Sequence, residues 1–237
     1  MRRVETIPET ARTPRTASAN KIGKSACQTL YHSSNLSRSL DIPLNTQVTI
    51  NFREIDVDPK EIGELFSKLR RERFGKWASR PNKGKKKFTQ SYVYTFENGT
   101  KTRECLSIDR EDHNIHVNWL VYIPPKRLHE FECIIWDWVV KLFGDAKSAK
   151  AIHIQPITDL KRLVGYTMKG AQQGNLDIYA SGQKHYPQGY IPWRRTGTSR
   201  NLGPTNRRRL DKVRGIKRAM PTKGFAKSKG SSPVLPT

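Results

Sequence analysis

The stretch from Asn114 to Pro124 constrains the fold more than any other part of this sequence. Its β-branched and aromatic residues predict a strand, which Pro124 ends. Because successive side chains on a strand alternate between its faces, His116 and Asn118 share one face. This polar pair is either the outer face of a half-buried strand or part of a site. The residues predicted to face a core are Ile115, Val117, Trp119 and Val121.

The net charge of +23 on 237 residues is the main feature of the composition. So large a positive excess indicates a polyanionic partner, because basic surfaces bind phosphate backbones. A ribosomal-type protein and a DNA enzyme both fit this charge. The length allows one domain of about 150 residues with additional tails.

Apolar periodicity and turn residues predict strands that alternate with helices. Residues 88–97 and the strand at 114–124 form a predicted hairpin with a long turn after Asn98-Gly99. The fold class is therefore α+β, an antiparallel sheet with helices packed on one face. The predicted strands cover residues 47–53, 88–97, 114–124 and 151–156, and the predicted helices cover residues 58–75, 126–143 and 159–170.

The ends of the chain differ in character from the middle. Residues 1–45 are rich in Ser, Thr, Arg and Asn, which predicts a mostly disordered basic leader. Residues 46–178 form the predicted core. Residues 179–237 form a basic segment with interleaved aromatic residues, in which residues 207–218 could form a short helix and the remainder is a disordered tail.

The three cysteines, Cys27, Cys105 and Cys133, include no CxxC pair, so free thiols in a reducing compartment are expected. No apolar run is long enough for a membrane span, and no apolar segment of a signal peptide follows Met1. These features predict a cytoplasmic protein without a membrane partner.

Tyr166 and Lys169 lie on the last predicted core helix with a spacing that places them on one face. Tyr166 could simply be the edge of the core stripe that contains Leu163, with Lys169 incidental. Alternatively, a tyrosine oxygen can attack a phosphodiester that a metal ion activates, and a lysine can hold the phosphate.

Together, these features resemble the HUH endonucleases, particularly the rolling-circle replication initiators of plasmids and single-stranded phages. That family has an apolar strand, which residues 48–52 resemble, followed by a His-hydrophobic-His motif and then Tyr-x-x-Lys on a helix. Residues 116–118 match the second motif in two of its three places, and residues 166–169 match the third. The resemblance covers roughly residues 45–205 and implies an RRM-like HUH fold.

Asn118 departs from the family pattern because it replaces the second metal-binding histidine. An amide oxygen is a hard ligand that suits Mg²⁺ or Mn²⁺. The family's third ligand often lies on the preceding strand, which suggests Glu97, although Glu97 could equally be a surface acid beside a turn. His113 is a further candidate.

The resemblance implies that Tyr166 attacks single-stranded DNA at an origin hairpin or nick site, with a host replication helicase or polymerase as further partner. The attack leaves a 5′-phosphotyrosine and a free 3′-OH that can prime replication or rejoin the ends. The alternative is a catalytically inactive DNA- or RNA-binding protein of the same fold. The basic residues predicted to contact nucleic acid are Lys83, Lys85, Lys86, Arg194, Arg195, Arg200, Arg207, Arg208 and Arg209.

Overall fold

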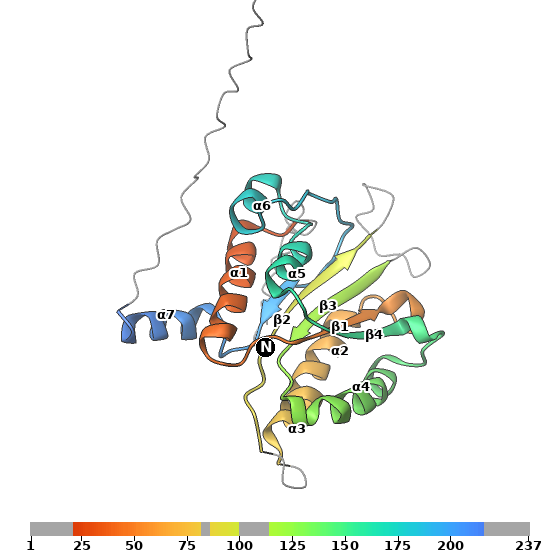
Figure 1. Cartoon of the computed structure of the whole chain (residues 1–237). Helices are drawn as coiled ribbons and strands as arrows, with labels where there is room; N and C mark the ends of the chain where they lie inside the picture. Colours follow the sequence, from red (N-terminus) through yellow and green to blue (C-terminus); the bar gives the residue numbers. More distant parts are fainter. Residues whose placement is uncertain (1–20, 82–85, 100–113, 216–237) are drawn as a thin grey trace, which may run out of the picture.

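A five-stranded antiparallel sheet forms the centre of the computed structural model, which describes residues 21–81, 86–99 and 114–215 (Figure 1). The strand order is β4-β1-β3-β2-β5, so the stretch that begins at Asn114 supplies the middle strand. The predicted α+β class, the antiparallel pairing and the β2–β3 hairpin are confirmed. The strands are β1 (Thr46–Asn51), β2 (Tyr92–Asn98), β3 (Ile115–Val121), β4 (Ile152–Pro156) and β5 (Thr196–Thr198).

Helices cover both faces of the sheet, although the sequence predicted that only one face would be covered. On one face, α2, a π-helical turn, α3 and α4 pack on the predicted core side of β3. On the other face, α1, α5 and α6 pack over the side of β3 that carries His116 and Asn118 (Figure 1). The helices are α1 (Lys24–Ser39), α2 (Ile62–Lys68), the π-helix (Leu69–Phe74), α3 (Gly75–Ser79), α4 (Leu128–Phe143), α5 (Leu160–Thr167), α6 (Gln173–Tyr179) and α7 (Pro204–Val213).

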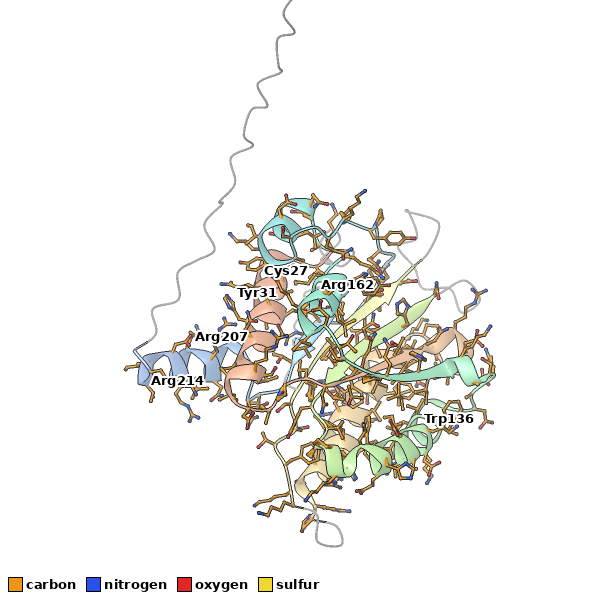
Figure 2. All side chains as sticks on the ribbon, in the orientation of Figure 1. Cys27, Tyr31, Trp136, Arg162, Arg207 and Arg214 are labelled. Atoms are coloured by element: carbon orange, nitrogen blue, oxygen red, sulfur yellow. The ribbon has the colours of Figure 1, made fainter. Side chains whose placement is uncertain are left out.

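The predicted core residues account for the packing of α4 against the sheet. Phe131, Ile135 and Val139 follow a four-residue spacing that turns one stripe inward, and all three are fully buried. The helix ends at Gly144, which has a positive φ of 106°. A Cβ there would also lie 2.6 Å from the carbonyl oxygen of Asp56, so only glycine fits this position. Side chains fill the space between the sheet and the helices on each side (Figure 2).

The predicted leader at residues 1–45 is wrong for its second half, because residues 24–39 form α1. The sequence did not predict this helix, because small polar residues occupy much of its buried side. Ser33 and Ser37 are fully buried, and the Ser33 hydroxyl donates a 2.8 Å hydrogen bond to the carbonyl of Leu202. A hydroxyl that bonds a backbone carbonyl can be buried without an apolar stripe. Residues 1–20 lie outside the described residues.

The C-terminal segment is partly built into the core. β5 pairs with β2, and α7 follows it and extends away from the sheet (Figure 1). The predicted boundary at residue 178 therefore cuts through one sheet. The helix predicted at 207–218 begins earlier, at Pro204, and residues 216–237 are not described. Within the described ranges, no helix combines the length and apolar character needed to cross a membrane.

Candidate active site

The β2–β3 pairing brings four polar residues together on one face of the sheet. Glu97 stands directly opposite His116, and Thr95 stands directly opposite Asn118. All four side chains share the face that α1, α5 and α6 cover. Thr95 and Glu97 are two residues apart on β2, and His116 and Asn118 are two residues apart on β3, so each strand turns both of its side chains to the same face. The structure therefore brings Glu97 and His116, two of the predicted metal ligands, into contact.

Glu97 is the centre of the site and is only 2% exposed. Its Oε2 lies 2.9 Å from His116 Nε2 and 2.7 Å from the Lys169 Nζ. Burial raises the pKa of the Glu97 carboxyl, but the hydrogen bond and charge of His116 and the charge of Lys169 outweigh burial. The pKa therefore lies below its ordinary value, and the group is a carboxylate at neutral pH.

Lys169 links this carboxylate to Tyr166. Its ammonium donates a 2.6 Å hydrogen bond to the Tyr166 hydroxyl and lies 3.9 Å from the centre of that ring. Burial lowers the pKa of Lys169, but the Glu97 carboxylate and the Tyr166 hydroxyl outweigh it and raise the pKa. Tyr166 lies on α5 and is 42% exposed, whereas Lys169 lies in the turn just after this helix. The ammonium thus stays charged beside an accessible phenol oxygen.

Local sequence explains why Tyr166 and Lys169 reach this position. The Asp159 side chain accepts a hydrogen bond from the Arg162 amide and fixes the start of α5. Leu160 and Val164 are buried in the core beneath the helix, so Tyr166 is turned to its more open side. Tyr166 therefore is not part of the buried core stripe.

Asn118 has a different set of partners from those expected of a metal ligand. Its side-chain oxygen accepts hydrogen bonds from Gln47 Nε2, at 3.0 Å, and from the Thr49 hydroxyl, at 3.2 Å. Gln47 Oε1 in turn accepts a 2.7 Å hydrogen bond from Gln155 Nε2. The amide oxygen of Asn118 is thus directed to β1 and ends a chain of amides that starts on β4.

Three buried polar atoms on this face have no hydrogen-bond partner among the described residues. They are Glu97 Oε1, Asn118 Nδ2 and Thr95 Oγ1. Buried polar atoms are normally paired, so this part of the face is suited to a ligand that can pair with them. The Glu97 carboxylate and the His116 imidazole, with Oε2 and Nε2 2.9 Å apart, are chemically suited to bind Mg²⁺ or Mn²⁺. Such an ion binds only a few protein groups, and water or phosphate oxygens occupy its other coordination positions.

Few side chains at this site can bind a metal ion, and the Lys169 ammonium competes with a cation for Glu97 Oε2. Among the described residues, no three His, Cys, Asp or Glu side chains gather as a metal-binding group. His116 and Glu97 are therefore the two residues that fit a divalent ion here, while the oxygen of Asn118 is engaged on β1. His113 lies outside the described residues.

A segment that sequence reasoning did not assign to the site borders it. The Tyr186 amide donates a 2.7 Å hydrogen bond to the Lys169 carbonyl, and the Gly189 amide donates one of equal length to the carbonyl of Asn98. These bonds fix residues 186–189 between the end of α5 and the end of β2. The Tyr186 ring is 58% exposed, with its centre 6.0 Å from the Lys169 ammonium. Its only sequence signal is an aromatic residue in a Gly- and Pro-rich segment.

The residues predicted to contact nucleic acid do not all lie on the surface. Arg195, one of the predicted nucleic-acid contacts, is 7% exposed and donates a 2.6 Å hydrogen bond to the Gly189 carbonyl. Burial lowers the pKa of Arg195 to about 10, and the charge of Glu97 partly opposes this effect. Arg195 therefore supports the site from inside the fold.

Five of the other predicted contacts lie beside β5 or on α7, namely Arg194, Arg200, Arg207, Arg208 and Arg209. Arg200 and Arg209 line a hollow of about 550 Å³ beside the start of α7. Arg207, labelled in Figure 2, is half-buried on this helix, and Arg208 is exposed. Arg194 and Lys86 are also exposed, whereas Lys83 and Lys85 lie outside the described residues.

Comparison of the chain with protein-family models, curated proteins and solved structures finds no match.

Proposed function

We propose that this protein nicks and joins single-stranded DNA with Tyr166 as the nucleophile, in the manner of an HUH endonuclease that initiates rolling-circle replication. The observation that carries the proposal is one continuous chain of contacts. It runs from the Tyr166 hydroxyl through the Lys169 ammonium to the Glu97 carboxylate and His116, with distances of 2.6, 2.7 and 2.9 Å. These are the Tyr, Lys and His whose spacing resembles the family motifs.

Each residue has a distinct role in this reaction. The Tyr166 oxygen attacks phosphorus, forms a phosphotyrosine bond to the 5′ end of the downstream fragment and loses its proton, while the 3′ oxygen of the upstream fragment departs and gains one. Lys169 stabilises the negative charge that develops on the phenol oxygen and on the phosphate. Glu97 holds the ammonium in place because its carboxylate stays ionised.

His116 and Glu97 would hold a Mg²⁺ or Mn²⁺ ion, which when bound supplies Lewis-acid polarisation of the scissile phosphate. The buried Glu97 Oε1, which has no hydrogen-bond partner in the described part of the chain, supports this assignment. Joining would reverse the attack, because a 3′-OH held near the phosphotyrosine can displace Tyr166. The basic surface of α7 would hold the strand without reading its sequence.

A binding protein without catalysis is the second candidate, because the Asn118 oxygen is engaged by Gln47 and Thr49. This candidate would bind DNA through the same basic surface. Recognition of RNA on an open sheet, as RRM domains do, is disfavoured because helices pack on both faces of the sheet.

Covalent capture separates the two candidates. A pool of random single-stranded oligonucleotides with a 3′ label is incubated with the full chain and Mn²⁺, and a denaturing gel is run. Tyrosine attack leaves the 3′ fragment on the protein, so the label should migrate with the chain. Tyr166→Phe should give no labelled band. Binding in a native gel without an adduct for any divalent ion would favour the non-catalytic candidate.

A further inference from the structure

A cationic hollow lined with aromatic rings lies on the opposite face of β2 from Glu97. It has a volume of about 300 Å³ and is formed by α2, the π-helix, β2 and the segment that leads into β5. Tyr94 and Phe96 line it, and because strand residues alternate, they point away from the Glu97 face. The hollow is therefore a separate place from the candidate active site.

Two arginines bring positive charge to this hollow. Arg70 is held over the rings of Tyr94, at 4.5 Å, and Phe66, at 5.0 Å, and it donates a 3.1 Å hydrogen bond to the Tyr92 hydroxyl. Arg194 lines the same hollow and is exposed. In the described ranges, neither guanidinium has a carboxylate within ion-pair distance. Arg70 Nε is also buried, and none of the residues that the structure describes forms a hydrogen bond with it.

The charges of both arginines act on the same phenol. Burial raises the pKa of Tyr94, and the positive charges of Arg70 and Arg194 partly oppose this effect. Arg70, Arg194 and Tyr94 all line the hollow. Arg70 is placed there by a π-helical turn, a rare element that often occurs at functional sites.

An indole ring and two glycines complete the walls. Trp193 packs edge-on against Phe96 with ring centres 5.6 Å apart, and its ring lies against Gly63. A Cβ at Gly63 would come within 2.6 Å of Trp193 Cγ, and one at Gly197 would overlap the Tyr94 ring. A larger side chain at either glycine would push a ring into the hollow.

This combination fits a ligand with one anionic end and one flat apolar end. Unpaired guanidinium groups bind phosphate oxygens, and an aromatic wall stacks on a base regardless of its identity. The volume is at the lower end for ligand sites, which matches a single nucleotide unit. We propose that this hollow binds a single nucleotide, with its phosphate between Arg70 and Arg194 and its base against Trp193.

The nucleotide could be free or could be one unit of a DNA strand that passes around the β5 edge. Both sources offer the same phosphate and base. Binding of dAMP to the full chain is measured by isothermal titration calorimetry in EDTA at fixed salt, so that no nicking occurs. Competition by a ten-residue oligothymidylate then distinguishes the sources: displacement of dAMP indicates a strand, and no displacement indicates a free nucleotide.

We expect dAMP to bind at least tenfold more tightly than adenosine or inorganic phosphate, because only dAMP engages both ends of the hollow. Arg194→Gln should weaken dAMP binding at least fivefold, and Ser67→Glu, which places a carboxylate in the hollow, should abolish it. Arg73→Gln is the matched control, since Arg73 is exposed on the same π-helix but does not line the hollow, and it should change little.

Equal affinities for dAMP and inorganic phosphate would overturn the proposal, because the binding would then reflect net charge alone. Equal losses in Arg194→Gln and Arg73→Gln would also overturn it. Thermal unfolding of each variant confirms that the fold is intact. The titration needs neither metal nor Tyr166, so dAMP could bind even if the protein does not nick DNA. Equally, the protein could nick DNA even if dAMP does not bind.

Discussion

Glu97 and His116 stand directly opposite each other across β2 and β3, with Oε2 and Nε2 2.9 Å apart. The backbone register fixes this pair, so it does not depend on a flexible loop. Lys169 joins it from the turn after α5 and extends it to Tyr166. A site that rests on paired strands is positioned more accurately than one built on loops.

The first prediction concerns Tyr166. Tyr166→Phe removes the attacking oxygen and keeps the ring, so it should abolish the covalent adduct and leave DNA affinity unchanged. Stability should change little, because the ring is 42% exposed. The adduct is measured on a denaturing gel and stability by urea unfolding.

Tyr186→Phe is the matched control, since Tyr186 is exposed and also lies near Lys169. It should retain the adduct. An adduct that persists in Tyr166→Phe would move the nucleophile to another tyrosine. Tyr190 would then be tested before Tyr179, which is 5% exposed and packed in the core.

The second prediction concerns the pH dependence of stability that Glu97 provides. Its pKa is lowered in the folded chain, so its contribution is complete above the unfolded value near 4.5 and is lost as the pH falls through the folded value. The groups that favour its charge are His116, Lys169 and Arg195. Urea midpoints should therefore fall more steeply below about pH 4.5 in the wild type than in Glu97→Gln.

Glu64→Gln is the control for this experiment. Glu64 also has a lowered pKa, through its hydrogen bond to Lys68, but it lies on the surface and its ion pair is exposed. Exposed ion pairs add little stability because water and salt screen them. The urea midpoint of Glu64→Gln should therefore depend on pH as in the wild type. If the pH dependence were weakened equally in Glu64→Gln and Glu97→Gln, Glu97 would not be the source of the acid-sensitive stability.

The sequence predicted the sheet well where the signal was local. Alternation along β3 placed His116 and Asn118 on one face correctly, and the turn at Asn98-Gly99 indicated the hairpin with β2. It missed α1, whose buried side includes hydroxyl groups bonded to backbone, and it missed β5, which is only three residues long. The partners of Asn118 were also unpredictable, because Gln47 and Thr49 lie 71 and 69 residues away in sequence.

The third prediction separates the exposed arginines of α7, which we expect to bind DNA, from the buried Arg195, which stabilises the fold. Arg208→Gln with Arg209→Gln removes exposed charge from α7, so affinity for every DNA sequence should fall alike. The slope of log affinity against log salt should decrease by about 1 for each lost phosphate contact. Arg195→Gln should instead destabilise the fold by about 1–3 kcal/mol, because it leaves the Gly189 carbonyl without its donor. A salt slope that changed only in Arg195→Gln would contradict this division.

The last prediction concerns the direction of the amide chain that ends at Asn118. Gln155 donates to Gln47, and Gln47 donates to Asn118, so the Asn118 oxygen faces β1. The buried nitrogen of Asn118 has no partner within the described ranges. Rotation of all three amide groups by half a turn would preserve both hydrogen bonds, because each amide carries a donor and an acceptor of similar shape. In that arrangement Asn118 would present its oxygen to the site and could add a third ligand, a hard oxygen, beside His116 and Glu97.

Gln155 lies on β4 and is exposed, so substitutions there can select the direction of the chain. In Gln155→Glu the side chain can only accept, which forces Gln47 to donate to it and turns the Asn118 oxygen into the site. Mn²⁺ should then bind at least threefold more tightly, as measured by electron paramagnetic resonance of free Mn²⁺. In Gln155→Lys the side chain can only donate, so Asn118 should remain turned to β1.

His153→Glu adds the same negative charge two residues away on the exposed face of β4 and controls for electrostatic attraction. If Gln155→Glu and His153→Glu strengthen Mn²⁺ binding equally, charge alone explains the effect and Asn118 is not a ligand. A gain confined to Gln155→Glu, and lost in the double variant with Asn118→Ala, would show that an amide oxygen completes the metal site.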